Sequence, residues 1–298
     1  MQAPVKIVPP IDITYAKLTS NVAETEYGNY AAGTTYALGA RVIVPATHDV
    51  WESLAAANTG NTPATSPTWW TRVGPTNRMA MVDGSISTQT TRSGGIDVTV
   101  APGETIDTLI LRNVDTASVR VRMTDPVDGV VYDQTTDMIA PISESEYYNW
   151  FFEPIARKNF LIATMPPYGS ADVRVELIDS ATAACGVMVL GLSRKIGEGT
   201  LTGARVGFTD YSGKTRDAWG QLQLIERDYS DKASISTIIM RDMVDPVSNL
   251  LKQRRAKPTV CIASDTYGSL VLYGLISFDV TIAYTTHSMC NLEIEGLT

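Results

Sequence analysis

Residues able to do acid–base chemistry are few in this 298-residue sequence. His48 and His287 are its histidines, and neither has the Gly-x-Ser-x-Gly segment or the catalytic cysteine that a His-based hydrolase needs. A glycosidase that uses two carboxylates stays an alternative, because such a pair needs to meet only in space. Glu144, Glu146 and Glu153 would be its candidates. Acids in turns are usually solvated, so we expect no enzymatic activity.

Metal and nucleotide sites lack their usual spacing. No cysteine lies near either histidine at zinc-ligand spacing, and the acids at positions 125, 128, 133 and 137 depart from the calcium-loop pattern, although a loop calcium stays an alternative. Gly213-Lys214-Thr215 resembles the end of a phosphate-binding loop, but Phe208 stands where a glycine is required and a strand is predicted to follow. We therefore expect no metal and no cofactor.

Composition excludes several classes of function. The formal net charge of −8 removes the general attraction to phosphates that nucleic-acid binding uses, so we expect no nucleic-acid partner. The longest apolar run, Gly186 to Leu192, is far too short to span a bilayer, and Met1 to Pro10 lacks the features of a signal peptide. The three cysteines are distant and odd in number, which favours assembly in a reducing cytoplasm over a disulfide framework.

A stretch rich in aromatic and small polar residues runs from about residue 27 to 74. In order it contains Tyr30, Gly33, Tyr36, Gly39, Ala40-Arg41-Val42, Trp51, the turn Asn58-Thr59-Gly60-Asn61-Thr62-Pro63, and Trp69-Trp70-Thr71-Arg72-Val73. This order resembles the small chitin-binding-type carbohydrate-binding modules. Their pattern is an aromatic residue, a Gly-x-x-Tyr-x-x-Gly-x-x-Val strand pair, a second aromatic strand, a Gly-x-x-Pro turn and a closing tryptophan.

The resemblance implies a three-stranded module over residues 27–78 that stacks aromatic faces on pyranose rings. Tyr36, Trp51 and one of Trp69 or Trp70 would then contact the sugar. In the alternative interpretation, the same tryptophans are the only core of so small a module, which acts as a spacer.

Residues 79–194 show the alternation of antiparallel strands over a core. Val119, Val121 and Met123 alternate with two arginines in 118–124, and a second alternating run covers 172–178. Short strands separated by Pro and Gly turns predict a β-sandwich or jelly roll. The aromatic run 147–153 is interpreted as a strand in a sheet or subunit interface, with a ligand surface as the alternative.

The two ends of the chain have distinct patterns. Residues 1–26 contain Pro4, Pro9 and Pro10, which predicts an extended arm that is either disordered or docked on a neighbouring subunit. Residues 195–298 predict a β-rich assembly domain with one helix at about 246–257. Asp245 is the expected N-cap and Pro246 the first helical residue, and Pro258 prevents continuation.

A second resemblance covers most of the chain after residue 27. The junction Gly74-Pro75-Thr76-Asn77-Arg78 with Met81-Val82-Asp83-Gly84, the run from Asp210 to Gly220 and the closing Cys290 to Leu297 are similar to segments of uncharacterised tail and baseplate proteins of tailed bacteriophages.

This resemblance implies a structural virion protein of the tail tip or baseplate, assembled in the host cytoplasm. Its partners would be further copies of itself, in a ring or trimer, other tail proteins, and host cell-surface polysaccharide as an added contact. The alternatives are a receptor-binding protein that adheres to host glycan and a polysaccharide depolymerase.

Overall fold

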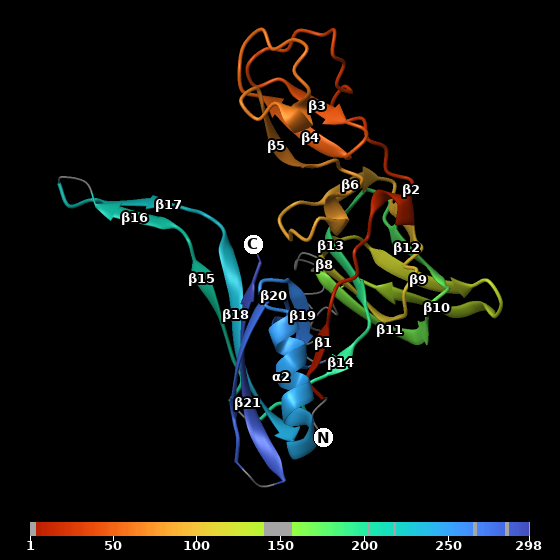
Figure 1. Cartoon of the computed structure of the whole chain (residues 1–298), viewed down its shortest axis with the longest axis vertical. Helices are drawn as coiled ribbons and strands as arrows, with labels where there is room; N and C mark the ends of the chain where they lie inside the picture. Colours follow the sequence, from red (N-terminus) through yellow and green to blue (C-terminus); the bar gives the residue numbers. More distant parts are fainter. Residues whose placement is uncertain are drawn as a thin grey trace, which may run out of the picture.

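The computed structural model describes residues 4–139, 157–201, 203–216, 219–264, 267–283 and 286–297. Within these ranges the chain forms five β-sheets and one α-helix, which confirms the mainly-β class predicted from the sequence. Figure 1 shows a small sheet (β3–β5) at one end, a β-sandwich below it, and a long sheet beside the sandwich that carries the helix and a projecting hairpin (β16–β17). The aromatic run 147–153 and its acids lie outside the described residues.

The β-sandwich pairs a five-stranded sheet with a four-stranded sheet. The first has the order β10 (Gly129–Asp137), β9 (Ser118–Asp125), β12 (Asp172–Ile178), β7 (Ile96–Val100), β2 (Leu18–Ser20). The second has the order β11 (Phe160–Tyr168), β8 (Ile106–Asp115), β13 (Thr182–Gly191), β6 (Thr90–Ser93).

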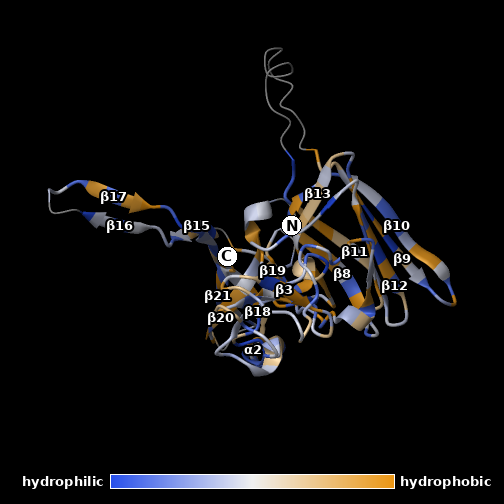
Figure 2. Cartoon of the chain, turned by 90° about the horizontal axis from the view of Figure 1, so that it is seen from above, coloured by the Kyte–Doolittle hydropathy of each residue, from blue (hydrophilic) through white to orange (hydrophobic). Residues whose placement is uncertain are grey.

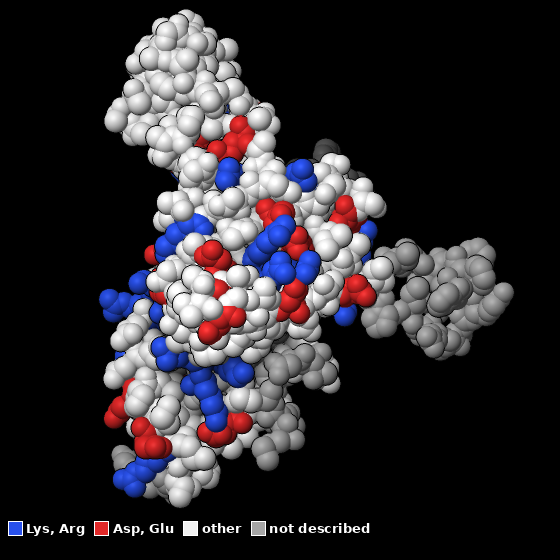
Figure 3. Space-filling view, turned by 90° about the vertical axis from the view of Figure 1, so that its right-hand side faces the viewer, with Lys and Arg blue, Asp and Glu red and all other residues white. Residues whose placement is uncertain are grey.

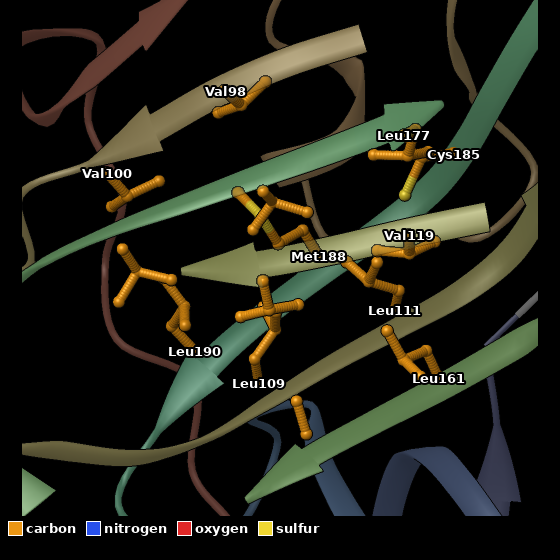
Figure 4. Packing of buried hydrophobic residues seen from close by; sticks show 14 of the residues in the cluster. Val98, Val100, Leu109, Leu111, Val119, Leu161, Leu177, Cys185, Met188 and Leu190 are labelled. Atoms are coloured by element: carbon orange, nitrogen blue, oxygen red, sulfur yellow. The ribbon is translucent and has the colours of Figure 1, made fainter. Parts of the chain in front are cut away.

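The sandwich core follows from the period-two pattern of its strands. Val119, Val121 and Met123 of β9 point inward and are buried, as the alternation predicts. All three belong to one cluster with apolar side chains of the facing sheet, and Figure 4 shows Val119 among them, together with Leu109 and Met188. The two sheets therefore share one apolar core.

Ion pairs occupy the outer face of the five-stranded sheet. Arg120 contacts Asp133 at 2.7 Å, and Arg174 contacts Asp97 at 2.7 Å and Glu176 at 2.8 Å. In Figure 3 acidic and basic side chains are intermixed on the side of the molecule that carries β9, β10 and β12. The charges compensate one another, so this face is explained as a solvated sheet surface.

Within the four-stranded sheet, β13 is buried on both faces. Nine of the ten positions of β13 are buried. Met188 and Leu190 belong to the sandwich core, whereas Val187 and Val189 pack against Tyr273 and its neighbours in the long sheet. The apolar run from Gly186 to Leu192, noted above as too short to span a bilayer, thus lies almost entirely in β13, a strand packed between two cores.

The long sheet has seven strands. Their order is β14 (Arg194–Lys195), β1 (Lys6–Val8), β19 (Thr259–Ile262), β20 (Val271–Thr281), β21 (His287–Gly296), β18 (Tyr229–Met240), β15 (Arg205–Asp210). Beyond β15 the chain continues into a two-stranded hairpin, β16 (Gly213–Arg216) and β17 (Leu222–Ile225).

The single helix among the described residues, α2 (Val244–Gln253), packs Val247 and Leu251 on the long sheet. It starts and ends earlier than the predicted 246–257, and its N-cap is Met243 rather than Asp245. Its end is early because the amides after Gln253 form tight turns, as in the bond from Lys257 N to Arg254 O at 3.1 Å. Ala256 has a φ of 56°, outside the helical region. Lys257 precedes Pro258, and the residue before a proline disfavours helical geometry.

The predicted N-terminal arm pairs within this chain. β1 lies between β14 and β19 in the long sheet, and β2 is the edge strand of the five-stranded sheet. Between them the amide of Ile11 donates to the carbonyl oxygen of Leu190 at 2.9 Å. Residues 4–20 therefore connect the sandwich to the long sheet.

The remaining elements are short. Three-residue 3₁₀ turns occur at Tyr15–Lys17, Pro63–Thr65, Ala80–Val82, Arg241–Met243 and Gly268–Leu270. No helix in the described part of the chain has the length and apolar character to cross a membrane.

Substitution of Gly191 by alanine tests the close crossing of the N-terminal segment over β13. A methyl group at Gly191 would collide with the carbonyl oxygen of Pro9 and approach the side chain of Val8. We expect Gly191→Ala to lower the free energy of unfolding by about 1–3 kcal/mol in denaturant titrations. Gly33→Ala is the control, because a methyl group there meets nothing within 4 Å. Equal stability of the two variants would contradict the packing described.

Candidate carbohydrate-binding site and assembly surface

The small sheet is built around one buried tryptophan. It consists of β3 (Arg41–Val44), β4 (Asp49–Ser53) and β5 (Trp70–Pro75). Trp70 is 1% exposed, and its Nε1 donates to the carbonyl oxygen of Asn61 at 2.8 Å. The rings of Tyr30 and Tyr36 meet it edge-on, with centroids 5.9 and 5.2 Å away. Trp70 therefore has no face open to a ligand.

Hydrogen bonds around Asn58 complete this module. Asn58 is fully buried, and its side-chain amide donates to Ser53 Oγ at 3.0 Å and accepts from Asn61 Nδ2 at 2.8 Å. Its main chain exchanges two bonds with Tyr36, at 2.9 and 3.0 Å. The turn that resembles the Gly-x-x-Pro element thus has a structural role, because a satisfied buried amide fixes loop geometry.

The other predicted sugar-contacting residues are half-buried. Trp51 lies on β4 opposite Val42 and Arg72, and Trp69 immediately precedes β5. The Nε1 atom of Trp51 is buried and has no hydrogen-bond partner among the described residues. Tyr36 accepts a bond from the amide of Ala31 at 2.8 Å, so its hydroxyl is occupied. Trp51 and Trp69 are the two tryptophans of the module that retain exposed surface for stacking.

Charged groups accompany Trp51 on the same sheet. Arg72 bonds Asp49 at 2.9 Å, and this contact raises the pKa of the arginine. Arg41 bonds Glu52 at 2.8 Å on the neighbouring strand pair. Such fixed guanidinium and carboxylate groups are suitable hydrogen-bond partners for sugar hydroxyls.

A polar junction that sequence reasoning missed joins the small module to the sandwich. His48 Nδ1 lies 2.9 Å from both carboxylate oxygens of Glu24, and Thr76 donates to the same carboxylate at 2.5 Å. The ring of Tyr15 stacks on His48 at 3.4 Å between centroids. The sequence marks His48 as a candidate hydrolase base or zinc ligand, and nothing in the spacing marks Glu24 as its partner. These contacts place His48 at the junction between the small module and the sandwich.

Candidate metal ligands and thiols are the remaining chemically active groups in the described part of the chain. No three His, Cys, Asp or Glu residues gather there as metal ligands. Cys185, Cys261 and Cys290 are free and buried, and desolvation raises their pKa values to about 12, 12 and 11. These thiols are protonated at neutral pH and are poor nucleophiles.

The outer hairpin, defined as residues 205–216 and 219–229, projects from the body of the molecule. Figure 1 shows β16 and β17 extending away from the body of the molecule, and Figure 2 shows apolar residues along β17. All four residues of β17 are exposed, including Leu222, Leu224 and Ile225. Exposed apolar side chains on an unsupported hairpin make it a candidate interaction surface.

No family model and no curated protein matches the chain. It is distantly similar to a chitosan-binding module of a chitosanase/glucanase from Paenibacillus sp. IK-5, with 11% identity over 37% of this chain and 81% of that one, at a TM-score of 0.25. It is also distantly similar to a protein in the tail of an empty gene-transfer-agent (GTA) particle with C6 symmetry, with 14% identity over 36% and 84%, at a TM-score of 0.27. TM-scores this low carry no argument about function.

Two tryptophan substitutions separate core from surface in the small module. We expect Trp70→Ala to destabilise the module by about 3–5 kcal/mol, because it removes a buried ring and leaves a cavity. Trp51→Ala should cost less, about 1–2 kcal/mol, since its ring is only partly buried. Limited proteolysis within residues 27–78 measures both effects. Rapid cleavage of the Trp51 variant and resistance of the Trp70 variant would contradict this division.

Proposed function

We propose that the chain is a structural building block of a phage-like tail and works as a homo-oligomer. The outer hairpin is the observation that carries this proposal, because its apolar side chains have no cover within the described chain. The resemblance of the 74–84, 210–220 and 290–297 segments to tail and baseplate proteins supports the same role. In this arrangement the long sheet and α2 form the assembly unit, and the sandwich and small module face outward.

The geometry of the long sheet supports a need for neighbours. β18 has twelve residues and spans about 40 Å, whereas the ten residues of α2 span about 15 Å. α2 packs against β20, and its length is less than half that of a strand as long as β18. Phe208 and Tyr229, whose rings are in edge contact at 5.8 Å, lie at the outer end and are more than half exposed. A neighbouring copy would supply the missing layer.

Native mass spectrometry of the intact chain tests the proposed assembly. We expect closed oligomers at micromolar concentration, and rings or trimers in electron micrographs of the same sample. A monomer at all concentrations up to about 100 μM, where weak protein pairs associate, would contradict the proposal.

We also propose that the small module contacts surface glycan through Trp51 and Trp69. The supporting observation is that Trp70, with Tyr30 and Tyr36, supplies the aromatic core, so the module does not need the other two tryptophans for that purpose. Receptor adhesion would then be an additional role of a tail component.

A glycan array followed by titration of the best hit tests this second role. We expect Trp51→Ala to weaken binding about tenfold, the loss that follows when one aromatic–sugar contact is removed. Leu38→Ala is the control, since Leu38 is an exposed apolar residue of the same module. Absence of glycan binding by the intact protein, or equal loss in both variants, would contradict the proposal.

A further inference from the structure

The last turn of α2 and the residues directly after it concentrate positive charge. Lys252, Arg254, Arg255 and Lys257 fall within six consecutive residues of a chain whose formal net charge is −8. None of these four side chains forms an ion pair or a hydrogen bond within the described part of the chain. Like charges held this close repel one another, so the cluster is electrostatically unfavourable without an anionic partner.

The helix end accounts for only part of this charge. A helix C-terminus favours cations in its last turn, which explains Lys252. Arg255 and Lys257 lie beyond the helix, where main-chain amides already bond the last carbonyl oxygens. Arg254 N bonds Leu251 O at 3.0 Å, and Arg255 N bonds Lys252 O at 3.3 Å. The helix dipole therefore leaves Arg255 and Lys257 unexplained.

Three of the four cations line one open hollow of about 560 Å³. Its lining consists of Asn249, Lys252, Gln253, Arg255 and Lys257, all of them exposed. Among the residues that the structure describes, no acidic side chain belongs to this lining. The hollow thus presents charge of a single sign, together with two carboxamides that can donate hydrogen bonds.

The fold places these side chains together in two ways. Positions 249, 252 and 253 share the helix face opposite Val247 and Leu251, which pack on the long sheet. After the helix, Ala256 has a φ of 56°, the left-handed conformation that ends a helical path. Arg255 and Lys257 flank this residue and lie at the hollow instead of continuing along the helix.

Arg254 has a different position. It lines a separate cavity of about 240 Å³ with Arg194 and Glu104, and the carboxylate of Glu104 lies 4.0 Å from Lys17. Charges of both signs meet in that cavity, so it offers no preference for an anion. Arg254 is therefore left out of the site.

We propose that the hollow at the end of α2 binds a multiply charged phosphate-type oxyanion. A single carboxylate would leave two of the three cations uncompensated, whereas linked or clustered phosphates bring several negative charges. The Arg255 guanidinium is suited to a bidentate contact with phosphate oxygens, and Lys252 and Lys257 supply compact charges. A free condensed phosphate and the phosphate headgroups of an anionic lipid surface present this same chemistry.

Calorimetric titration of the intact chain with inorganic tripolyphosphate tests the site. In phosphate-free buffer at about 50 mM salt we expect a Kd on the order of 10–100 μM. The affinity should fall about tenfold at about 250 mM salt, because these charges are exposed and are screened. A chain with Lys252→Gln, Arg255→Gln and Lys257→Gln should bind at least about tenfold more weakly.

A charge-matched variant separates a local site from general attraction. Lys158→Gln, Arg227→Gln and Arg241→Gln remove the same number of positive charges at exposed positions that form no ion pair within the described residues. We expect this control chain to bind tripolyphosphate within about twofold of the native chain. An equal loss in both triple variants would overturn the inference. Thermal melting of the two variants checks that both remain folded.

Flotation with phosphatidylglycerol vesicles identifies the source of the phosphate. Binding of either probe that the site variant loses and the control variant keeps supports the inference, and the probe that binds names the source. Binding of neither probe by the native chain would overturn it. This inference uses neither the outer hairpin nor the tryptophans of the small module, so its failure leaves the proposed assembly and glycan contact untouched.

Discussion

Double burial of β13 is the constraint on which the rest of the structure depends. Its residues alternate between the sandwich core, where Met188 and Leu190 pack, and a second core shared with the long sheet, where Val187 and Val189 pack. A strand that is apolar on both sides needs a layer on each side. The five-stranded sheet supplies one layer, and β1, β19 and β20 supply the other. The N-terminal segment is therefore part of this packing, because Val8 of β1 contributes to the second core.

The same constraint explains what remains uncovered. The sandwich packs on the part of the long sheet that includes Val260 and Tyr273, and α2 covers the region around Ile235 and Leu292 on the other face. Neither layer reaches the outer ends of β15 and β18 or the hairpin beyond them, so their apolar side chains stay exposed in the single chain. Burial of such surface is the main driving force of association. Contact with a second copy at this end would cover the apolar side chains that neither layer reaches.

Much of the fold could be predicted because its signals are local. The alternation in 118–124 and 172–178 directly reflects one buried face, and both runs are strands in the structure. Sequence patterns could not place β1 in the long sheet, because its partner β19 is some 250 residues away. Nor could they decide which of the adjacent Trp69 and Trp70 is core: at a strand entrance this depends on the turn around Asn58 and Asn61. The pairing of Glu24 with His48 likewise arises only when two units meet.

The central claim is that the single chain is incomplete at its outer hairpin and that a second copy covers it. Hydrogen–deuterium exchange of residues 205–229, measured across a dilution series of the native chain, tests this most directly. The account predicts fast exchange of these amides in dilute samples and marked protection as the concentration rises, with β13 protected throughout. Equal and fast exchange of the hairpin at every concentration would contradict it.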